Sequence, residues 1–293
     1  MKFGITPPYR ANVTTDAEWM TYFVRNAEST GFDSVSVVEH VVVPAGLADN
    51  YPYSESGRWV LPVDCELPDP LDLLAFLAAR TDRIGLSTGI LIGPLHHPLM
   101  LAKRLATIDK LSGGRMRLGV GVGWMEEEIA AMGVDFESRG RRLDEVIDAM
   151  RALWWDEEAT FEGEFFRFER AISRPRPTRA NGIPIHIGGH SPAAARRAGR
   201  VGDGFQPIGL APELLVDRIA LMRRTADESG RDPDAVEITL GASLATFDEE
   251  QLDSLRTLGA HRIQLSASTD DLNLIAEQMW EVSPFIDNGT FGD

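Results

Sequence analysis

Apolar residues along the chain follow two alternating patterns, short continuous runs and stretches with a helical spacing of three and four residues. The runs predict buried strands, and the spaced stretches predict amphipathic helices. Met1–Ile5 is the first short apolar run. Residues 20–27 carry apolar side chains on one helical face, and Gly31 stands where a helix C-cap is expected. Phe32–Val38 is apolar and β-branched, so we expect a second buried strand there.

The same alternation continues through the rest of the chain. Further strands are expected at Ile84–Leu91, Met116–Val120, Ile183–Ile187, Gly204–Ile208, Val236–Leu240 and Arg262–Leu265. Further helices are expected at Pro70–Arg80, Pro98–Leu111, Leu143–Trp154 and Leu272–Trp280, with others that begin at Pro192, Pro212 and Asp248. About eight strand–helix units of about 37 residues each predict a parallel sheet closed into a (β/α)8 TIM barrel, an α/β fold. A doubly wound open sheet is the structural alternative.

One segment departs from this alternation. Residues 155–180 contain several phenylalanines and then the sequence RPRP at 174–177. This composition predicts an excursion from the barrel, a short hairpin followed by an extended linker. No linker rich in proline, glycine and serine divides the chain, so we expect residues 1–293 to form a single domain.

Composition and charge narrow the classes of function. A chain with 43% hydrophobic and 25% charged residues has the composition of a folded globular protein. Its net charge of −16 argues against a surface for nucleic acid or for an anionic membrane. No apolar run reaches the roughly 18 residues of a membrane span, and the N-terminus lacks the apolar core of a signal peptide. The single cysteine, Cys65, excludes an internal disulfide, and we expect a cytoplasmic protein.

Several common chemical motifs are absent. Gly119–Trp124 is rich in glycine but lacks the spacing of a dinucleotide-binding loop, and none of the three lysines follows a glycine as in a P-loop. No metal-binding motif is present. His96 and His97 are neighbours whose side chains would point to opposite faces of a strand, so we interpret them as structural residues at the helix entry before Pro98.

Candidate functional residues follow four of the predicted strands, because the carboxyl ends of TIM-barrel strands meet at the mouth that holds the active site. These segments are Glu39-His40, Ser87–Leu91, Gly119–Trp124 and Ile187–Ser191. His40 is the best candidate for acid–base chemistry, and a structural hydrogen bond is its alternative role. Trp124 can stack on a flat ring or cover the mouth. The acidic run Glu126–Glu128 is interpreted as the solvated first turn of a helix.

The segment Gly188–Ser191 has the features of an anion site. Its two glycines allow a ligand to approach the backbone closely, and Ser191 can cap the helix that begins at Pro192. Free N–H groups at such a helix start attract an anion such as a phosphate. An ordinary glycine-rich turn with a serine cap has the same sequence, so both interpretations stay open at this point.

Four stretches of the chain together resemble the bacterial-luciferase-like family of flavin and deazaflavin oxidoreductases. They are AESTGFDS at 27–34 with Glu39-His40, TDRIGLSTGIL at 81–91 with His97-Pro98, DKLSGGR at 109–115 with LGVGVGW at 118–124, and PIHIGG at 184–189 with GDGF at 202–205. They occur in the family's order and span most of residues 1–210. The resemblance is greatest to the actinobacterial branch that uses coenzyme F420, an 8-hydroxy-5-deazaflavin. It implies a (β/α)8 barrel with the ring cofactor at the C-terminal mouth.

The resemblance also implies roles for individual residues. His40 matches the catalytic histidine that faces the ring, and Gly89-Ile90 matches a position where these barrels often hold a cis peptide bond. The residues expected to bind the cofactor are Glu39, Thr88, Gly89, Ile90, Val122, Gly123, Trp124, Gly188, Gly189, His190 and Ser191. Arg196, Arg197 and Arg200 are candidates for contacts with the F420 tail. Trp59, Trp124 and Phe205 are candidates for an apolar mouth that excludes water.

The resemblance implies hydride transfer between the C5 atom of F420 and a small organic substrate. One departure matters, because the deazaflavin sugar-phosphate dehydrogenases of the family carry a glutamate where this chain has Val122–Met125. Sugar-phosphate oxidation is therefore not expected. One alternative is an FMN-dependent monooxygenase that uses reduced FMN from a partner reductase and O2, and another is a non-catalytic flavin-binding protein. Family members commonly pair, so we expect a homodimer.

Overall fold

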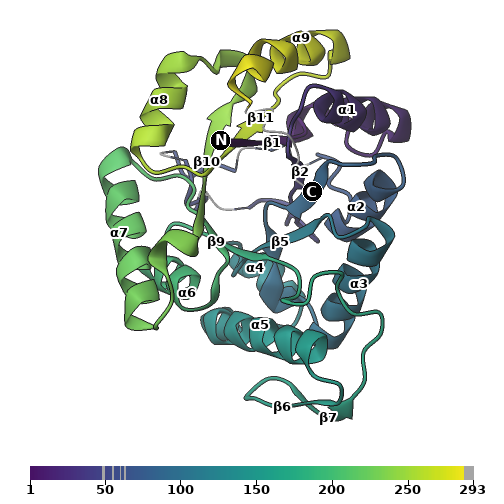
Figure 1. Ribbon diagram of the computed structural model, residues 1–293, viewed down its shortest axis with the longest axis vertical. Helices are drawn as coiled ribbons and strands as arrows, with labels where there is room; N and C mark the ends of the chain where they lie inside the picture. Colours follow the sequence, from purple (N-terminus) through teal and green to yellow (C-terminus); the bar gives the residue numbers. More distant parts are fainter. Residues whose placement is uncertain (48–49, 55, 60, 63, 287–293) are drawn as a thin grey trace.

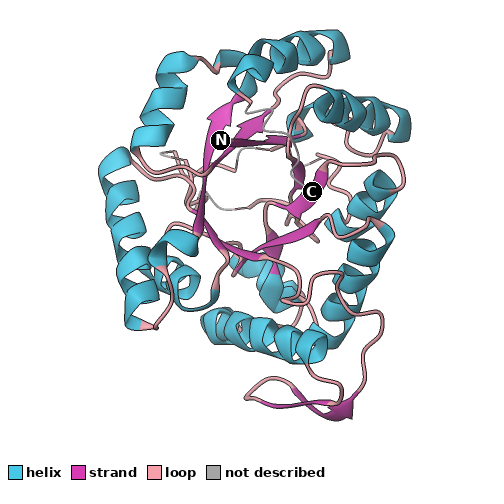
Figure 2. Cartoon of the chain, viewed as in Figure 1, coloured by secondary structure: helices cyan, strands magenta, loops and turns pink. Residues whose placement is uncertain are grey.

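The computed structural model describes residues 1–47, 50–54, 56–59, 61–62 and 64–286. Eight parallel strands form a closed barrel, with helices arranged in a ring around it (Figures 1 and 2). The barrel strands are β1 (Lys2–Thr6), β2 (Ser34–Val37), β3 (Gly85–Thr88), β5 (Met116–Gly121), β8 (Ile185–Gly188), β9 (Gly204–Gln206), β10 (Glu237–Ser243) and β11 (Arg262–Ser266). Each pairs with the next along the chain, and β11 pairs with β1 to close the barrel. The expected TIM barrel is therefore confirmed.

Helices connect the strands on the outside. They are α1 (Ala17–Ser29), α2 (Pro70–Ala78), α3 (Pro98–Leu111), α4 (Glu126–Ala131), α5 (Arg139–Trp155), α6 (Pro192–Val201), α7 (Pro212–Glu228), α8 (Glu249–Thr257) and α9 (Leu272–Val282). Among the described residues, none of these helices is both long enough and apolar enough to cross a bilayer. The bounds of α3 agree with the sequence prediction, and the other matching elements shift by a few residues. The predicted strand Ile84–Leu91 is divided into β3 and the short β4 (Leu91–Ile92), which pairs with β5.

The predicted excursion is an antiparallel hairpin of β6 (Ala159–Glu162) and β7 (Arg167–Ala171) that projects from the barrel (Figure 1). The carboxylate of Glu145 on α5 accepts the N–H groups of three consecutive residues of its loop, at distances of 2.6–3.2 Å. This one side chain therefore fixes the turn of the hairpin to the helix that precedes it.

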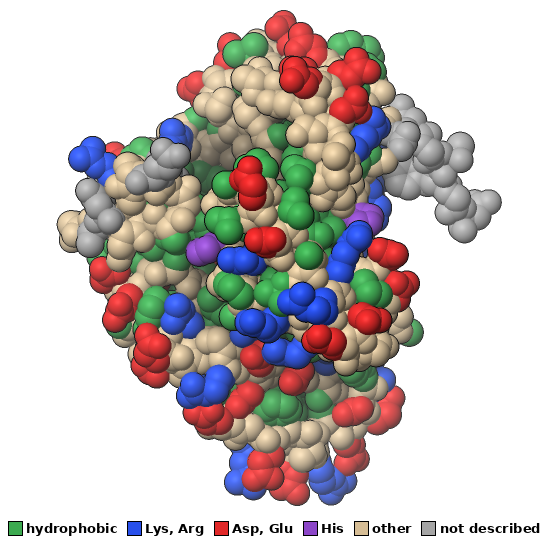
Figure 3. Space-filling view, turned by 90° about the vertical axis from the view of Figure 1, so that its left-hand side faces the viewer, with side chains coloured by type: hydrophobic (Ala, Val, Ile, Leu, Met, Phe, Trp, Pro, Cys, Tyr) green, Lys and Arg blue, Asp and Glu red, His purple; other side chains and the backbone are tan. Residues whose placement is uncertain are grey.

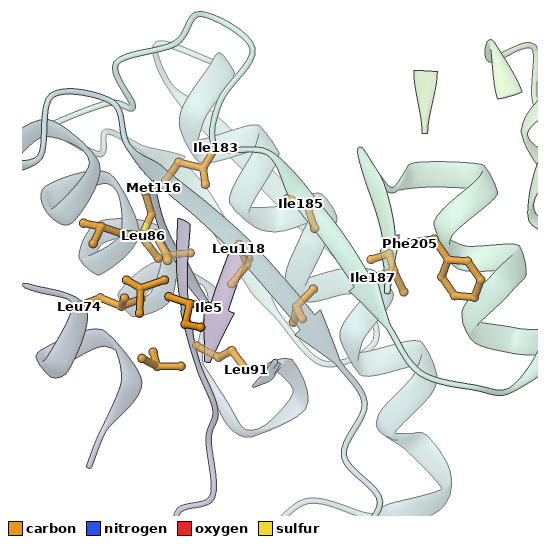
Figure 4. Packing of buried hydrophobic residues seen from close by; sticks show 14 of the residues in the cluster. Ile5, Leu74, Leu86, Leu91, Met116, Leu118, Ile183, Ile185, Ile187 and Phe205 are labelled. Carbon is orange, nitrogen blue, oxygen red and sulfur yellow. The ribbon is translucent and has the colours of Figure 1, made fainter. Parts of the chain in front are cut away.

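The two faces of the barrel strands differ in character. The outward-facing residues, such as Leu118, Ile185 and Ile187, are apolar and fully buried against the helices (Figure 4). The inward positions between them are mostly polar or glycine. A Cβ atom at Gly4 would overlap Gln264, and one at Gly204 would overlap the ring of His186. Bulky branched residues usually fill TIM-barrel interiors, so this polar interior is unusual for the fold.

Two buried arginines cross the amino-terminal half of this interior. The guanidinium of Arg117 donates to the hydroxyls of Ser34, at 3.0 Å, and Ser87, at 3.2 Å. Arg262 donates to the same Ser34 hydroxyl at 3.1 Å, to Glu237 at 2.8 Å and to Asp33. Burial, opposed in part by the neighbouring carboxylates, lowers the pKa of Arg117 to about 10, so it is still a cation at neutral pH. These bonds join β2, β5 and β11 across the barrel.

Some residues in the stretches that resemble the luciferase-like family have a structural role. At this amino-terminal end they hydrogen-bond the backbone that connects the helices to the strands. The carboxylate of Glu28 accepts the N–H groups of Asp82, Arg83 and Ile84, which form the entry to β3. Arg115 donates five hydrogen bonds, four of them to backbone carbonyls between residues 78 and 112. Part of the family pattern therefore reflects the way that the helices connect to the strands, and not the binding of a cofactor.

We predict that Arg115→Met lowers the free energy of unfolding by about 3 kcal/mol, because partly buried carbonyls lose their donors. Arg224→Ala removes an exposed arginine that lies 3.9 Å from Glu228, and it should change stability by less than about 0.5 kcal/mol. Urea denaturation followed by circular dichroism measures both. Equal stability of Arg115→Met and the wild-type protein would contradict this structural role.

Candidate functional site

The carboxyl ends of the barrel strands bring together most of the predicted site residues. His40 follows β2, Ile90 lies between β3 and β4, and Trp124 follows β5. Gly188 ends β8, and Ser191 precedes α6. In TIM-barrel enzymes this end holds the active site. Among the described residues, no group of three or more His, Cys, Asp or Glu side chains could hold a metal ion.

His40 is held by a buried carboxylate from another element. Its Nδ1 atom lies 2.8 Å from Oε2 of Glu128, which belongs to α4 and is fully buried. The other oxygen of Glu128 accepts the N–H groups of Val41, at 2.5 Å, and Val42, at 3.4 Å. Glu128 therefore fixes both the imidazole of His40 and the backbone that follows it.

The position of Glu128 corrects the interpretation of the acidic run as a solvated helix turn. Glu126 and Glu127 are exposed, but Glu128 is on the buried face of α4. Counting from the buried Met125, Glu128 and Ile129 lie three and four residues further on, which places all three on one helical face. That spacing in the sequence could have identified Glu128 as a buried functional candidate.

The Glu128 contact determines the tautomer of His40. An ionised carboxylate can only accept, so the hydrogen of a neutral His40 ring is placed on Nδ1. No partner for Nε2 is found in the described part of the chain, and the side chain is 11% exposed. The Nε2 atom is therefore available to a ligand at the mouth, as an acceptor when the ring is neutral.

Glu39, beside His40 in the sequence, also has a positioning contact. It is buried, and its carboxylate accepts the N–H of Ile92 at 2.5 Å and lies 2.9 Å from Nε2 of His96. His97 caps α3 by accepting the N–H of Leu99 at 3.3 Å. The structural interpretation of the two neighbouring histidines is therefore confirmed. A cofactor contact of Glu39 stays a prediction.

The end of the third strand fills the upper part of the barrel. The peptide bond between Gly89 and Ile90 is cis, as the resemblance implied. A Cβ atom at either Gly121 or Gly188 would overlap the side chain of Ile90. These two glycines therefore make room for Ile90 in this structure. Thr88 is buried and donates its hydroxyl hydrogen to the carbonyl of Gly119 at 2.6 Å, so this hydroxyl supports the barrel.

The turn before α6 has the donors of an anion site. Gly189 has a φ of +127°, a conformation that favours glycine, and Ser191 caps the helix by accepting the N–H of Ala194 at 3.1 Å. The carbonyl of His190 accepts from Arg218 on α7 at 3.0 Å. Burial, and then the charge of Arg218, lowers the pKa of His190. Its Nδ1 atom is buried without a partner among the described residues, so it can serve a ligand.

Two of the three arginines expected to contact a cofactor tail have other partners. Arg197 is buried and bonded to Asp144 at 2.7 Å, which corrects its expected role. Arg200 also contacts Asp144, at 3.2 Å, whereas Arg196 is exposed. Lysine and arginine side chains gather near the centre of the face on which α6 and α7 lie, with acidic side chains among and around them (Figure 3). A contact of Arg196 with a cofactor tail stays a prediction.

Aromatic rings surround His40. Trp59 and Trp124 lie edge-on to its ring at centroid distances of 4.9 and 6.2 Å, and their own rings are 5.4 Å apart. Tyr51 contacts both tryptophans, and Tyr53 lies edge-on to His190 at 5.1 Å. Burial raises the pKa of Tyr53 to about 12, so it is neutral at physiological pH. The indole N–H of Trp59 is buried without a partner among the described residues.

The other expected mouth residues differ in position. Val122 and Gly123 are half-buried and lead into Trp124, and Gly123 has a φ of +78°. Phe205 is not at the mouth. It is fully buried in the hydrophobic core (Figure 4), because its neighbours Gly204 and Gln206 face the barrel interior and side chains alternate along a strand.

Comparison with known proteins identifies the family. The sequence profile of the luciferase-like monooxygenases matches residues 1–277. The chain belongs to this family. Two relatives of the chain are named F420-dependent dehydrogenases, and the family itself is named for monooxygenases. Both are oxidoreductases, so the chain belongs to a family of oxidoreductases.

Individual luciferase-like relatives show how far the similarity extends. The F420-dependent glucose-6-phosphate dehydrogenase of Nakamurella multipartita is 34% identical over 231 residues, which are 77% of this chain and 62% of that enzyme. An F420-dependent secondary alcohol dehydrogenase, solved with an F420–acetone adduct, has a TM-score of 0.78 at 20% identity and covers 98% of this chain and 99% of its own. The monooxygenase RslO1 of Streptomyces bottropensis has a TM-score of 0.76 at 24% identity, with 97% and 98% covered. The two solved structures confirm the fold.

We predict that neutral His40 carries its ring hydrogen on Nδ1 and that Glu128→Ala removes this preference. The reason is that only Glu128 offers an acceptor to Nδ1 in the described structure. The ¹⁵N chemical shifts of the imidazole report the tautomer, and the signal that disappears in His40→Ala identifies the residue. Glu127→Ala, at the exposed neighbour, should leave the signal unchanged. A wild-type ring with its hydrogen on Nε2 would refute the assignment.

Proposed function

We propose that this protein is an F420-dependent oxidoreductase that transfers a hydride between C5 of the deazaflavin and a small organic substrate. The observation that carries the proposal is His40, oriented by the buried Glu128 at the mouth where luciferase-like barrels work. The choice of F420 is supported by the 34% identity to an enzyme named for that cofactor. When bound, the deazaflavin supplies the hydride chemistry, and the protein supplies position and electrostatics.

The residues present fit a phosphate-bearing ring cofactor. The N–H of Gly189 is bonded to the carbonyl of Gln206, so the turn before α6 offers the N–H groups of His190 and Ser191 at a helix start, the unpartnered Nδ1 of His190 and the nearby cation of Arg218. Trp59 and Trp124 supply flat apolar surfaces next to His40. The phosphate would be held by the turn and the ring by the aromatic and strand-end residues.

His40 would bind the substrate oxygen through Nε2. With Nδ1 engaged by Glu128, the neutral ring accepts the hydroxyl hydrogen of an alcohol substrate at Nε2, and the carboxylate stabilises the imidazolium that results. In the opposite direction, the protonated ring returns this hydrogen to a carbonyl oxygen. The aromatic residues around His40 would keep water away from the reacting atoms.

Glu128 provides a carboxylate in a chain that lacks the strand-four glutamate of the sugar-phosphate dehydrogenases. It reaches the site from α4 and contacts His40 through hydrogen bonds, with both of its oxygens engaged. Glu128 is therefore proposed as a positioning residue for His40. Because no other carboxylate replaces the missing glutamate at residues 122–125, glucose 6-phosphate is not proposed as the substrate.

A second candidate is a monooxygenase that receives reduced FMN from a partner reductase. The family itself is named for luciferase-like monooxygenases, and the same turn and histidine would serve FMN. The two candidates differ in the cofactor that binds, so a direct binding measurement separates them.

We predict that F420 binds with a dissociation constant at least about tenfold below that of FMN. Because Trp124 lies at the site, bound cofactor should quench its fluorescence, and Trp124→Phe should reduce the quenching. Trp280→Phe, at a 70% exposed position on α9, should not. Tight FMN binding with no detectable binding of F420 would reject the first candidate in favour of the second.

We further predict that His40→Ala lowers kcat/KM by about 10²–10⁴-fold, because general acid–base catalysis is worth that much. Turnover is followed as loss of oxidised F420 absorbance with a panel of small secondary alcohols. F420 affinity should stay within about threefold of the wild-type value, since His40 acts on the substrate. His261→Gln, at the opposite end of the barrel, is the matched control. Full turnover by His40→Ala would remove the assigned role.

A further inference from the structure

A cavity lies at the amino-terminal end of the barrel, opposite His40. Its volume is about 790 Å³, and its walls include the first residues of β1, β2, β3, β5, β8, β10 and β11. None of the residues at the His40 mouth lines it. The two sites are therefore separated by the length of the barrel strands.

The cavity is cationic although the protein carries a net charge of −16. Six basic side chains line it, against four acidic ones. The basic residues are Lys2, Arg83, Arg115, Arg117, Arg179 and Arg262, and the acidic residues are Glu28, Asp33, Asp203 and Glu237. The side chains of Arg83 and Arg179 are exposed and have no ion pair among the described residues. An excess of positive charge in so acidic a chain indicates a binding site for an anion.

The two buried arginines retain unused donors. Arg117 donates from Nε to Ser87 and from Nη2 to Ser34. Its Nη1 atom lies 3.9 Å from the carboxylate of Asp33. Arg262 uses Nε and Nη1 on Glu237, Asp33 and Ser34, and no bond of its Nη2 is found within the described residues. A guanidinium has five N–H donors, so both groups can still donate to an oxyanion.

His186 supplies a further polar group to the same cavity. It is only 3% exposed and lines the cavity, and neither ring nitrogen has a hydrogen-bond partner in the described part of the chain. Burial, followed by the charge of Arg117, holds the pKa of His186 well below its ordinary value, so the ring is neutral and carries one N–H. The Nδ1 atom lies against Gly204, where a Cβ would come within 2.3 Å of it, so a ligand in the cavity would meet the ring at Nε2, the nitrogen that is not enclosed.

We propose that this cavity binds a compact oxyanion of the phosphate class, held by Arg117, Arg262 and His186, with Arg179 at its entrance. Phosphate suits these groups because its oxygens point in several directions and can meet two guanidinium groups and an imidazole together. The charged groups around Arg117 are four cations, Arg117 itself, Arg262, Lys2 and Arg179, and two carboxylates, Asp33 and Glu237. A dianion would neutralise this excess of two positive charges. The oxyanion is either inorganic phosphate or the phosphate group of a small ester.

The test follows the imidazole ¹⁵N signals of His186 in the full-length protein while phosphate is added at constant ionic strength. Because the turn at Gly188–Ser191 could also hold phosphate, a signal inside the cavity is needed to locate the binding. His186→Gln identifies the signal. Saturable shifts with inorganic phosphate, absent with chloride, are the expected result. Glycerol 3-phosphate is the second arm: binding of both ligands assigns a phosphate-group site, and binding of inorganic phosphate alone assigns a site for the free ion.

Two substitutions test the donors. Arg179→Ala should weaken phosphate binding about tenfold, and Arg117→Lys should weaken it by about tenfold or more, because each removes charged hydrogen bonds. Arg224→Ala, an exposed arginine on α7 outside the cavity, should leave the affinity unchanged. If Arg117→Lys does not fold, Arg179→Ala decides. No shift of His186 with either phosphate compound, or equal affinity of Arg179→Ala and the wild-type protein, would overturn the proposal.

Discussion

The hydroxyl of Ser34 is the point at which three strands of the barrel meet by hydrogen bonding. It accepts from Arg117 of β5 and from Arg262 of β11, so β2 is joined to strands on both sides across the interior. Two buried guanidinium groups are tolerated because serine hydroxyls and the carboxylates of Asp33 and Glu237 accept part of their hydrogen bonds and balance their charge. The barrel is therefore held from inside by hydrogen bonds and from outside by apolar packing against the helices.

A related arrangement supports the functional end. The segment that follows β2 is fixed by two buried carboxylates, its own Glu39 and Glu128 from α4. Glu39 ties the segment to the residues after β3, and Glu128 orients His40. A side chain that is already held in position before the substrate binds loses little conformational entropy on binding, and this favours catalysis. The proposed role of His40 thus depends on α4 as much as on its own strand.

Much of the fold could be predicted from the sequence, because strand–helix alternation is a local and repeated signal. Helix α3 agreed in both bounds, since Pro98 and the glycines after Leu111 delimit it clearly. The sequence did not predict that the barrel interior is polar. In short runs such as MRLGVG, the apolar residues that face outward suggest a strand that is apolar on both faces. Arg117 is a polar residue within such a run, and only the closed barrel shows that it reaches Ser34. Among the site residues, His40 could be chosen from its place after a strand. The spacing after Met125 could place Glu128 on a buried helix face, but only the contact across 88 residues shows that it meets His40.

The side chain of Ile90 has a consequence for the surface beside His40. It occupies the space that Gly121 and Gly188 leave open at the carboxyl ends of β5 and β8, and it is itself partly exposed. The position of this side chain therefore depends on two other strands, because any residue larger than glycine at 121 or 188 would displace it. A substitution in β5 or β8 would in this way alter the surface beside His40 without changing any residue that contacts the imidazole.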